Sequence, residues 1–344
     1  MDDNDHHYVD DRLYTKWMKE PLRAGDVLLT SEAPTGEVAY IAEDVDWAVG
    51  QRLFALRGRP EILDGRYLSY LLRGGHVRHQ LMSRTTGTTV SGIRQSELVK
   101  IELDLPSVDE QRAIAAMLGA LDEKVESNRR LVELVPALLA ACVAEALADE
   151  STRNPVASLA AFVNGGAYTK GATGTGRMVI RIAELNSGPG GSTVYNDIEV
   201  PETKTARAGD ILMSWSGSLG VYRWALDEAI INQHIFKVIP SGYPAWFVFD
   251  RLKAVMPLFQ AVAKDKATTM GHIQRGHLES TAVAVPSADA LRVLDAKLSP
   301  VWDWLLHAER EIVRLTALRD GLMPELLSGG LRTGESLADL EFAP

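Results

Sequence analysis

The chain has 344 residues, of which 46% are hydrophobic and 24% charged, which suits about two domains with ordinary cores. Its single cysteine, Cys142, excludes a disulfide scaffold and any cysteine-based zinc site, and so favours a reducing cytoplasm. The formal net charge of -10 argues at first against a polyanionic partner.

The sequence also argues against a membrane protein. We find no apolar run that approaches the roughly 18 residues of a membrane-spanning helix. The first residues, MDDNDHHYVDD, lack the basic start and apolar stretch of a signal peptide. We therefore expect a soluble, cytoplasmic protein with no membrane partner.

The first hundred residues predict a small domain with a β core and flanking helices. Strands are expected at 26–30, 37–42, 51–57 and 100–105, the last because apolar and polar residues alternate strictly there. A helix is expected at 66–84, where leucines recur on one side.

Basic residues concentrate in two segments. Residues 57–100 contain eight Arg or Lys against three acidic residues, and residues 251–278 contain five against one. Much of the acidity lies in 109–150, with nine acidic against four basic residues. Local fields matter more to docking than the total charge, so we expect one basic arm in each half of the chain.

A long helix is expected to begin after Pro106, because Ser107 and Glu110 form a capping box. Apolar residues then recur at alternating spacings of four and three, the period of a coiled-coil seam. The seam positions are Ile114, Leu118, Leu121, Val125, Asn128, Val132, Val135, Leu139 and Cys142. An amphipathic helix lying on a domain is the alternative. We expect Pro136 to kink this helix or end it early.

The second half of the chain repeats the first. RAGDILMSWSGSLGV (207–221) echoes RAGDVLLTSEAPTGEV (23–38), and QHIF (233–236) echoes QRLF (51–54). TTMGHIQRGHL (268–278) matches TTVSGIRQSEL (88–98) at a constant separation of 180 residues, which pairs Ile273 with Ile93. A repeat of this length indicates a tandem duplication.

The repeat extends into a second long helix. A helix at 245–264, broken at Pro257, corresponds to the one at 66–84. The second seam positions are Leu294, Leu298, Val301, Leu305, Ala308, Ile312 and Leu315. Asn128 corresponds to Ala308, so we expect the one polar seam residue to lie near a small one. Gly321, Pro324 and Gly329-Gly330 are expected to interrupt or end this helix. A helix of about 40 residues is about 60 Å long.

Several stretches resemble a known family. LPSVDEQRAIAAMLGALDEKVESNRRLVELVPALL resembles the first conserved helical region of the specificity (S) subunit of Type I restriction-modification systems. LRDGLMPELLSGGLR resembles the tail of its second conserved region, and GDVLLTSEAPTGEVA and TTMGHIQRGHL resemble stretches of its target-recognition domains. The resemblance covers nearly the whole chain.

The resemblance implies an α+β fold. Two target-recognition domains, each a mixed α/β unit with a β-rich core, stand in tandem repeat and are separated by two long antiparallel coiled-coil helices. The implied boundaries are 1–106 for a truncated first domain, 107–150 for the first spacer helix, 151–286 for the second domain, 287–330 for the second spacer helix and 331–344 for a C-terminal tail.

The resemblance also implies a function. Each domain reads one half of a bipartite site in double-stranded DNA, and the helices set the gap between the halves. Modification (methyltransferase) subunits, two of them, dock on the chain and bind S-adenosylmethionine, so no cofactor is expected here. Restriction (translocase/nuclease) subunits are further candidate partners. The expected setting is phage defence.

Candidate DNA-binding residues come from the repeated loops and basic arms, which offer hydroxyls and cations to phosphates and base edges. They are Thr30, Ser31, Thr35, Arg84, Thr86, Thr88, Thr89, Lys170, Ser214, Trp215, Ser216, Ser218, Lys264, Lys266, Thr268, Thr269 and His272. Alternatively, these residues form solvated turns whose hydroxyls bond their own backbone.

We expect no catalysis in this chain and no metal site. No Asn/Asp-Pro-Pro-aromatic motif, HExxH or nucleophile elbow occurs, and GATGTGRM (171–178) has Arg-Met where a phosphate-binding loop needs Lys-Ser/Thr. Two alternatives stay open. One is a coiled-coil scaffold with two protein-binding domains and no DNA contact, and the other is a decayed orphan specificity subunit.

Two features depart from the family pattern. The first copy has no counterpart of VASLAAFVNGGAYTKGATGTGRMVIRIAEL (156–185), so we expect it to read its half-site less strongly. The second helix keeps Ser287 but has lost the capping-box Glu, so its start is expected to be less firm.

Overall fold

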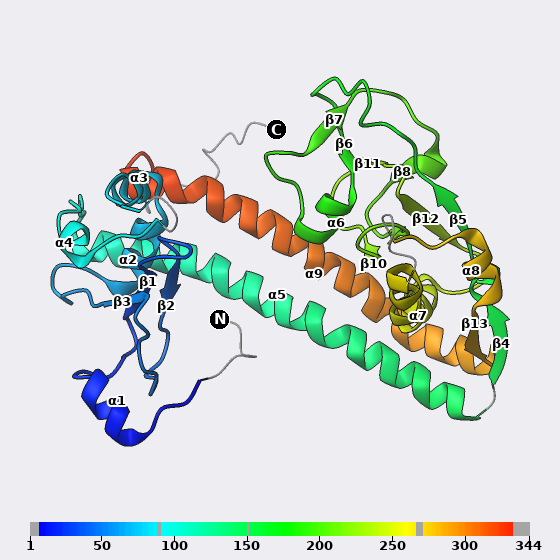
Figure 1. The fold of residues 1–344 in the computed structure, drawn as a ribbon, viewed down its shortest axis with the longest axis horizontal. Coiled ribbons are helices and arrows are strands. Elements are labelled where there is room, and N and C mark those ends of the chain that lie inside the picture. Colours follow the sequence, from blue (N-terminus) through cyan, green and yellow to red (C-terminus); the bar gives the residue numbers. More distant parts are fainter. Residues whose placement is uncertain (1–6, 88–90, 150, 266–270, 333–344) are drawn as a thin grey trace. The chain divides into compact units, whose positions relative to one another are not determined.

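The structure, a computed structural model, describes residues 7–87, 91–149, 151–265 and 271–332 (Figure 1). The chain divides into two compact units. Unit 1 comprises Met1–Lys124 and Leu315–Pro344, and unit 2 comprises Val125–Arg314. The two long helices, α5 (Val108–Asp149) and α9 (Ala288–Ser328), each contribute residues to both units. The units therefore share the helices that the sequence analysis set apart as spacers.

A three-stranded antiparallel sheet of order β2-β1-β3 lies in unit 1. Its strands are β1 (Val27–Thr30), β2 (Val38–Tyr40) and β3 (Leu53–Leu56), which confirms three of the predicted strands. The fourth prediction, at 100–105, is wrong, because this segment forms no strand. Its counterpart in unit 2 is β13, which pairs with β4, and no described residue of unit 1 takes the place of β4.

The helix predicted at 66–84 is two helices, α2 (Gly65–Arg73) and α3 (Gly75–Ser83). They meet at Gly74, where an added Cβ would lie 2.9 Å from Leu327 Cδ1 of α9. A side chain at the junction would therefore crowd Leu327 of α9. Two shorter helices complete the described part of unit 1, namely α1 (Asp11–Trp17) and α4 (Gln95–Leu98).

Unit 2 contains two four-stranded sheets and one two-stranded sheet. The first, of order β10-β9-β12-β5, comprises β5 (Ala160–Asn164), β9 (Ile211–Ser214), β10 (Gly220–Arg223) and β12 (Ile235–Pro240). The second, of order β7-β6-β11-β8, comprises β6 (Arg177–Ile180), β7 (Val194–Asn196), β8 (Thr205–Ala206) and β11 (Ala229–Ile231). The third pairs β4 (Ser151–Pro155) with β13 (Ala282–Pro286). The helices that lie wholly in unit 2 are α6 (Ile182–Ser187), α7 (Ala245–Asp265) and α8 (Arg275–Ser280), with single 3₁₀ turns at Val156–Ser158 and Glu202–Lys204.

Pro136 was expected to kink or end its helix and Pro257 to break its own, but neither proline ends its helix. α5 continues through Pro136 to Asp149, and α7 continues through Pro257. Val135 and Leu139, near Pro136, are buried in the core of unit 2, as is Met256 beside Pro257, whereas Leu258 on its other side is 53% exposed. Burial of Val135, Leu139 and Met256 offsets the lost ladder hydrogen bond. α9 ends at Ser328, before Gly329, whose φ is +74°.

The predicted seam positions are all buried or half-buried. In unit 1, Ile114 and Leu118 of α5 share a core with Leu322 and Leu326 of α9. In unit 2, the buried seam residues of α5 share a core with those at the start of α9. Figure 1 shows the two helices side by side within each unit. The 3.5-residue period thus identified the buried face.

The polar seam residue finds a partner that the sequence did not indicate. Asn128 is buried, and its amide donates to Glu311 Oε2 at 2.7 Å rather than facing only Ala308. The serine caps are present at both helix starts: Ser107 Oγ accepts from the Glu110 amide at 3.3 Å, and Ser287 Oγ accepts from the Ala290 amide at 3.4 Å.

Helix α5 contains a longer apolar stretch than we expected anywhere in this chain. An 18-residue window within Val108–Ala148 has a mean hydropathy of 2.0, so by length and composition α5 passes as a membrane span. Only 17% of that window is buried within the structure. Leu134 and Leu138 are 67% and 54% exposed, so this part of α5 presents an apolar face. The expectation of no such run was therefore wrong.

Candidate nucleic-acid interface

The repeated RAGD motif forms the same turn in both units. In unit 1, the Arg23 amide donates to Asp26 Oδ2 at 2.8 Å, and the Asp26 amide donates back to Arg23 O at 3.0 Å. In unit 2, the equivalent distances between Arg207 and Asp210 are 2.7 and 2.9 Å. The third residue is a glycine with φ of +95° in one turn and +97° in the other, a conformation that favours glycine. The turn sets the start of the strand that leads to the candidate site.

Each turn carboxylate is held by a different cation. Asp26, 2% exposed, accepts from Arg57 Nε at 2.6 Å and Nη2 at 2.7 Å. These hydrogen bonds from Arg57 hold the pKa of Asp26 below its usual value, against the opposing effect of burial. Asp210 is instead 2.8 Å from Nζ of Lys237, an ammonium whose side chain is only 10% exposed.

A hydroxyl closes the loop after the strand in both units. Thr30 Oγ1 donates to Pro34 O at 2.5 Å and accepts from the Glu37 amide at 2.8 Å. Ser214 Oγ donates to Ser218 O at 2.7 Å and accepts from the Gly220 amide at 2.8 Å. These two hydroxyls therefore bond their own loop, as the alternative interpretation of the sequence held.

Three chain segments meet beyond this hydroxyl, and we call their junction the loop framework. In unit 1, the Ser31 amide donates to Arg52 O at 2.8 Å, and the Ile93 amide donates to Ser31 O at 2.9 Å. Isolated bridges also join Gly92 to Glu32 and to Thr86. The loop after β1, the start of β3 and the segment before α4 are thereby fixed to one another.

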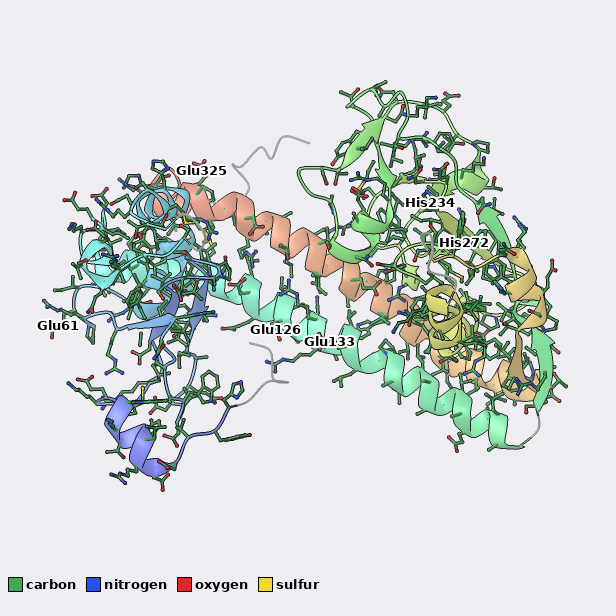
Figure 2. The ribbon with its side chains drawn as sticks, in the orientation of Figure 1. Glu61, Glu126, Glu133, His234, His272 and Glu325 are labelled. Atoms are coloured by element: carbon green, nitrogen blue, oxygen red, sulfur yellow. The ribbon has the colours of Figure 1, made fainter. Side chains whose placement is uncertain are left out.

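Unit 2 contains the same framework. The Trp215 amide donates to His234 O at 3.2 Å, the Ile273 amide donates to Trp215 O at 3.0 Å, and a bridge joins Ser216 to His272. Figure 2 shows His234 and His272 close together in this unit. The Trp215 ring centroid lies 5.5 Å from that of His234 and 6.4 Å from that of His272.

The side chains on the two frameworks differ. In unit 1, Arg52 Nε is 3.0 Å from Glu32 Oε1, and the two side chains are 69% and 41% exposed. In unit 2, the equivalent positions hold His234 and Ser216, with His234 Nδ1 3.0 Å from Ser216 Oγ. The same backbone geometry thus presents an arginine–glutamate pair in one unit and a histidine–serine pair in the other.

The framework contains only some of the residues predicted to bind DNA. Ser31, Trp215, Ser216 and His272 belong to it, Thr30, Thr35, Thr86, Ser214 and Ser218 lie in its loops, and Arg84 lies just before Thr86. Lys170 lies in the turn after β5, and Lys264 lies near the end of α7. Thr88, Thr89, Lys266, Thr268 and Thr269 fall outside the described residues.

Burial argues against three of these candidates as DNA contacts. Ser214 is 0% exposed, Thr35 is 6% exposed and Ser216 is 7% exposed. Thr35 Oγ1 donates to Ser91 O at 2.6 Å, so it ties two loops together. A buried hydroxyl that bonds its own chain holds a loop in place and does not reach a base edge.

The basic arm of unit 1 (residues 57–100) has fewer unpaired cations than its composition indicates. Most of its cations have carboxylate partners within the unit, among them Arg57 with Asp26, Arg66 with Glu123 and Lys100 with Glu97. In the equivalent segment of unit 2, Arg251 pairs with Asp250. Both arms therefore carry less unpaired positive charge than the residue counts indicate.

Sequence reasoning missed Glu32, Arg52 and His234. The signal was present, because QRLF and QHIF align within the repeat while their second residues differ. A position that changes inside an otherwise matching stretch is a candidate for specificity. Its partner could not be identified, since Glu32 and Ser216 come from another loop.

Neither a metal site nor a phosphate loop is found in the part of the chain that the structure describes. No group of three or more His, Cys, Asp or Glu side chains there could hold a metal ion. The glycines at 171, 174 and 176 all have positive φ and lead into strand β6 rather than a helix. A phosphate-binding loop needs a helix at that point, so this segment is a turn.

Comparison with known proteins places these features in context. Residues 15–136 match the family described as "Type I restriction modification DNA specificity domain". The chain is 22% identical over 359 residues to the Type I restriction enzyme MjaIX specificity subunit of Methanocaldococcus jannaschii, covering 90% of this chain and 78% of that one. It is 29% identical over 125 residues to the MjaVIII specificity subunit of the same organism, covering 35% of this chain and 29% of that protein.

A solved structure resembles the fold of the whole chain. The crystal structure of the Type-I restriction-modification system S subunit from M. genitalium superposes with a TM-score of 0.62. The two sequences are 17% identical, and the match covers 90% of this chain and 84% of that one. At this identity the likeness is one of fold.

Proposed function

The chain belongs to the family of Type I restriction-modification specificity subunits, and from this premise we propose that it recognises a bipartite site in double-stranded DNA. Each unit is a target-recognition domain for one half-site, and the two domains form a tandem repeat. In this proposal the chain itself is not catalytic and acts in the cytoplasm.

One observation carries the proposal. The same loop framework occurs in both units, with matching hydrogen bonds from Ser31 and Ile93 in one and from Trp215 and Ile273 in the other. A repeated backbone that carries different side chains suits a protein that reads two different short sequences. A scaffold that bound two proteins would not require paired frameworks of this kind.

The long helices are proposed to form an antiparallel coiled coil that carries the partner subunits. The shared cores of α5 and α9 and the bond from Asn128 to Glu311 support this pairing. The apolar face around Leu134 and Leu138 supports a docking surface, because large exposed apolar patches mark interaction sites. We assign it to methyltransferase subunits, two per chain, which bind S-adenosylmethionine. Restriction subunits join the same assembly.

Substitution of the apolar face tests the docking surface. Leu134→Lys combined with Leu138→Lys is expected to weaken co-purification with the methyltransferase subunit at least about tenfold, because two lysines would be desolvated at the contact. Val99→Lys, at an equally exposed apolar residue of unit 1, is the matched control. Undiminished co-purification of the double variant would contradict this assignment.

DNA binding is tested by its salt dependence. The complex of this chain with its methyltransferase subunit should bind duplex DNA with an affinity that falls steeply with salt, because phosphate contacts release about 0.9 counterions each. A salt-independent interaction, or no binding to any duplex, would favour the scaffold without DNA contact.

The first half-site is proposed to be read less strongly than the second. Unit 1 presents one three-stranded sheet in its described residues, whereas unit 2 presents two four-stranded sheets. Footprinting should then show weaker protection of one half-site. Equal protection of both would contradict this part of the proposal, and no protection of either would indicate an orphan subunit.

A further inference from the structure

We infer that the residues at two equivalent framework positions determine which base each unit selects, Arg52 held by Glu32 in unit 1 and His234 held by Ser216 in unit 2. The inference rests on the proposed function, since it names the side chains that discriminate bases in the two half-sites. None of Glu32, Arg52 and His234 stood out in the sequence as a DNA contact.

The first support is positional equivalence. Arg52 O and His234 O accept from the amides of Ser31 and Trp215, which follow the loop-closing hydroxyl in each unit. Glu32 and Ser216 are next along the chain, and each forms a bridge to the residue before the equivalent isoleucine. The same backbone hydrogen bond and the same bridge therefore place the two side-chain pairs at equivalent positions of the two units.

The second support is that the pair changes while its connection is kept. Unit 1 has an arginine–glutamate pair where unit 2 has a histidine–serine pair, and the polar atoms of each pair are 3.0 Å apart. An ion pair as exposed as this one contributes little to stability, so folding alone does not require it. A bond that holds the headgroup in one orientation is what a side chain needs to read a base edge.

The third support is the chemistry of the headgroups. An arginine whose Nε pairs with a carboxylate still has Nη donors available, and this fork matches O6 and N7 of guanine in the major groove. Arg52, 69% exposed, is placed for such a contact. In unit 2, His234 Nδ1 contacts Ser216 and His234 Nε2 lies 3.2 Å from Gln233 Nε2, so the ring holds the exposed Gln233 amide, which presents its remaining donor and acceptor. Unit 1 thus prefers a guanine, and unit 2 reads its position differently.

Selection from randomised duplex DNA tests the inference, with the full chain bound to its methyltransferase subunits. Arg52→Ala should reduce the preference for guanine at one position of one half-site by roughly 5- to 150-fold, the range of a bidentate contact. The other half-site should keep its preferences. His234→Ala should relax one position of the other half-site only.

Arg59→Ala is the matched control, because it removes the same charge from an exposed residue of unit 1 outside the framework. This change should weaken binding to all sequences alike, as the loss of a general attraction to phosphates does. Glu32→Gln should reduce the guanine preference less than Arg52→Ala, because it loosens the arginine without removing it. This intermediate effect separates a positioning residue from a structural one.

The outcomes separate the inference from the proposed function. If the wild-type complex enriches a split motif and Arg52→Ala leaves every base preference unchanged, the inference is overturned and the proposed function stands. An Arg52→Ala effect that matches the uniform loss in Arg59→Ala overturns it as well. If the wild-type complex enriches no duplex at all, the proposed function itself fails.

Discussion

Units 1 and 2 share their RAGD turn but differ in how many neighbours their strands have. β12 in unit 2 pairs on both sides, with β9 and β5, whereas β3 in unit 1 pairs only with β1 among the described residues. Likewise β13 pairs with β4, while 100–105 forms no strand. The turn depends on four adjacent residues and is kept in both units. A strand depends on a distant partner, so it forms only where that partner is present.

Removing the turn carboxylates is the strongest challenge to this comparison. Asp210→Ala is expected to cost about 3 to 5 kcal/mol, because it removes the carboxylate that lies 2.8 Å from the buried Lys237 ammonium. Asp26→Ala should cost only about 1.5 to 3 kcal/mol, since Arg57 is 39% exposed and can turn to water. Chemical denaturation monitored separately in each unit by hydrogen exchange measures the loss of stability in both variants. Equal costs would show that the two turns have the same energetics after all.

A core substitution tests whether the units are stabilised separately. Leu118, 0% exposed, packs in the core of unit 1, so Leu118→Ala should destabilise that unit by about 2 to 5 kcal/mol. Leu134→Ala on the exposed face of the same helix should change stability by less than about 0.5 kcal/mol. Region-resolved hydrogen exchange should place the effect of Leu118→Ala in unit 1. An equal loss of protection in unit 2 would mean that the two cores unfold as one.

The stability of unit 1 at acid pH should differ between the wild type and Asp26→Asn, which cannot ionise at this position. The pKa of Asp26 is lowered in the folded state, so its contribution to stability is fully present above its unfolded value of about 3.9 and is lost as the pH falls through the folded value. Below about pH 4, the free energy of unfolding of unit 1 should fall less steeply in Asp26→Asn than in the wild type. Denaturation curves between pH 5 and pH 2 provide the comparison. Parallel slopes would contradict the lowered pKa.

The smallest expected effect concerns the free edge of β3. Amides of β3 that point away from β1 should exchange with solvent at least about tenfold faster than the corresponding amides of β12, which face a second strand. Hydrogen exchange read by mass spectrometry or NMR resolves this difference. Matching protection factors would reveal that another segment covers this edge of β3.

Much of the architecture could be predicted from local sequence. The repeat, three strands of unit 1, the caps at Ser107 and Ser287, and the seam positions all follow from spacing or turn chemistry. The errors have a common cause in tertiary contacts. Contact with Leu327 fixes the break at Gly74, and core packing carries α5 through Pro136.

The candidate site could be predicted only in part. The repeated loops were identified correctly as the place where the units correspond, but hydroxyl-rich sequence directed attention to Thr35 and Ser214, which are buried. Arg52 and His234 escaped notice because their partners, Glu32 and Ser216, are 20 and 18 residues away in the chain. Whether a hydroxyl faces outward or closes its own loop depends on the fold and not on its immediate sequence.

The account rests on two units that read two separate half-sites. The most direct test is to map DNA methylation in cells that carry this chain together with its methyltransferase subunit. The account predicts modified sites with two specified parts separated by a gap of constant length. A contiguous motif, or methylation that does not depend on this chain, would contradict it.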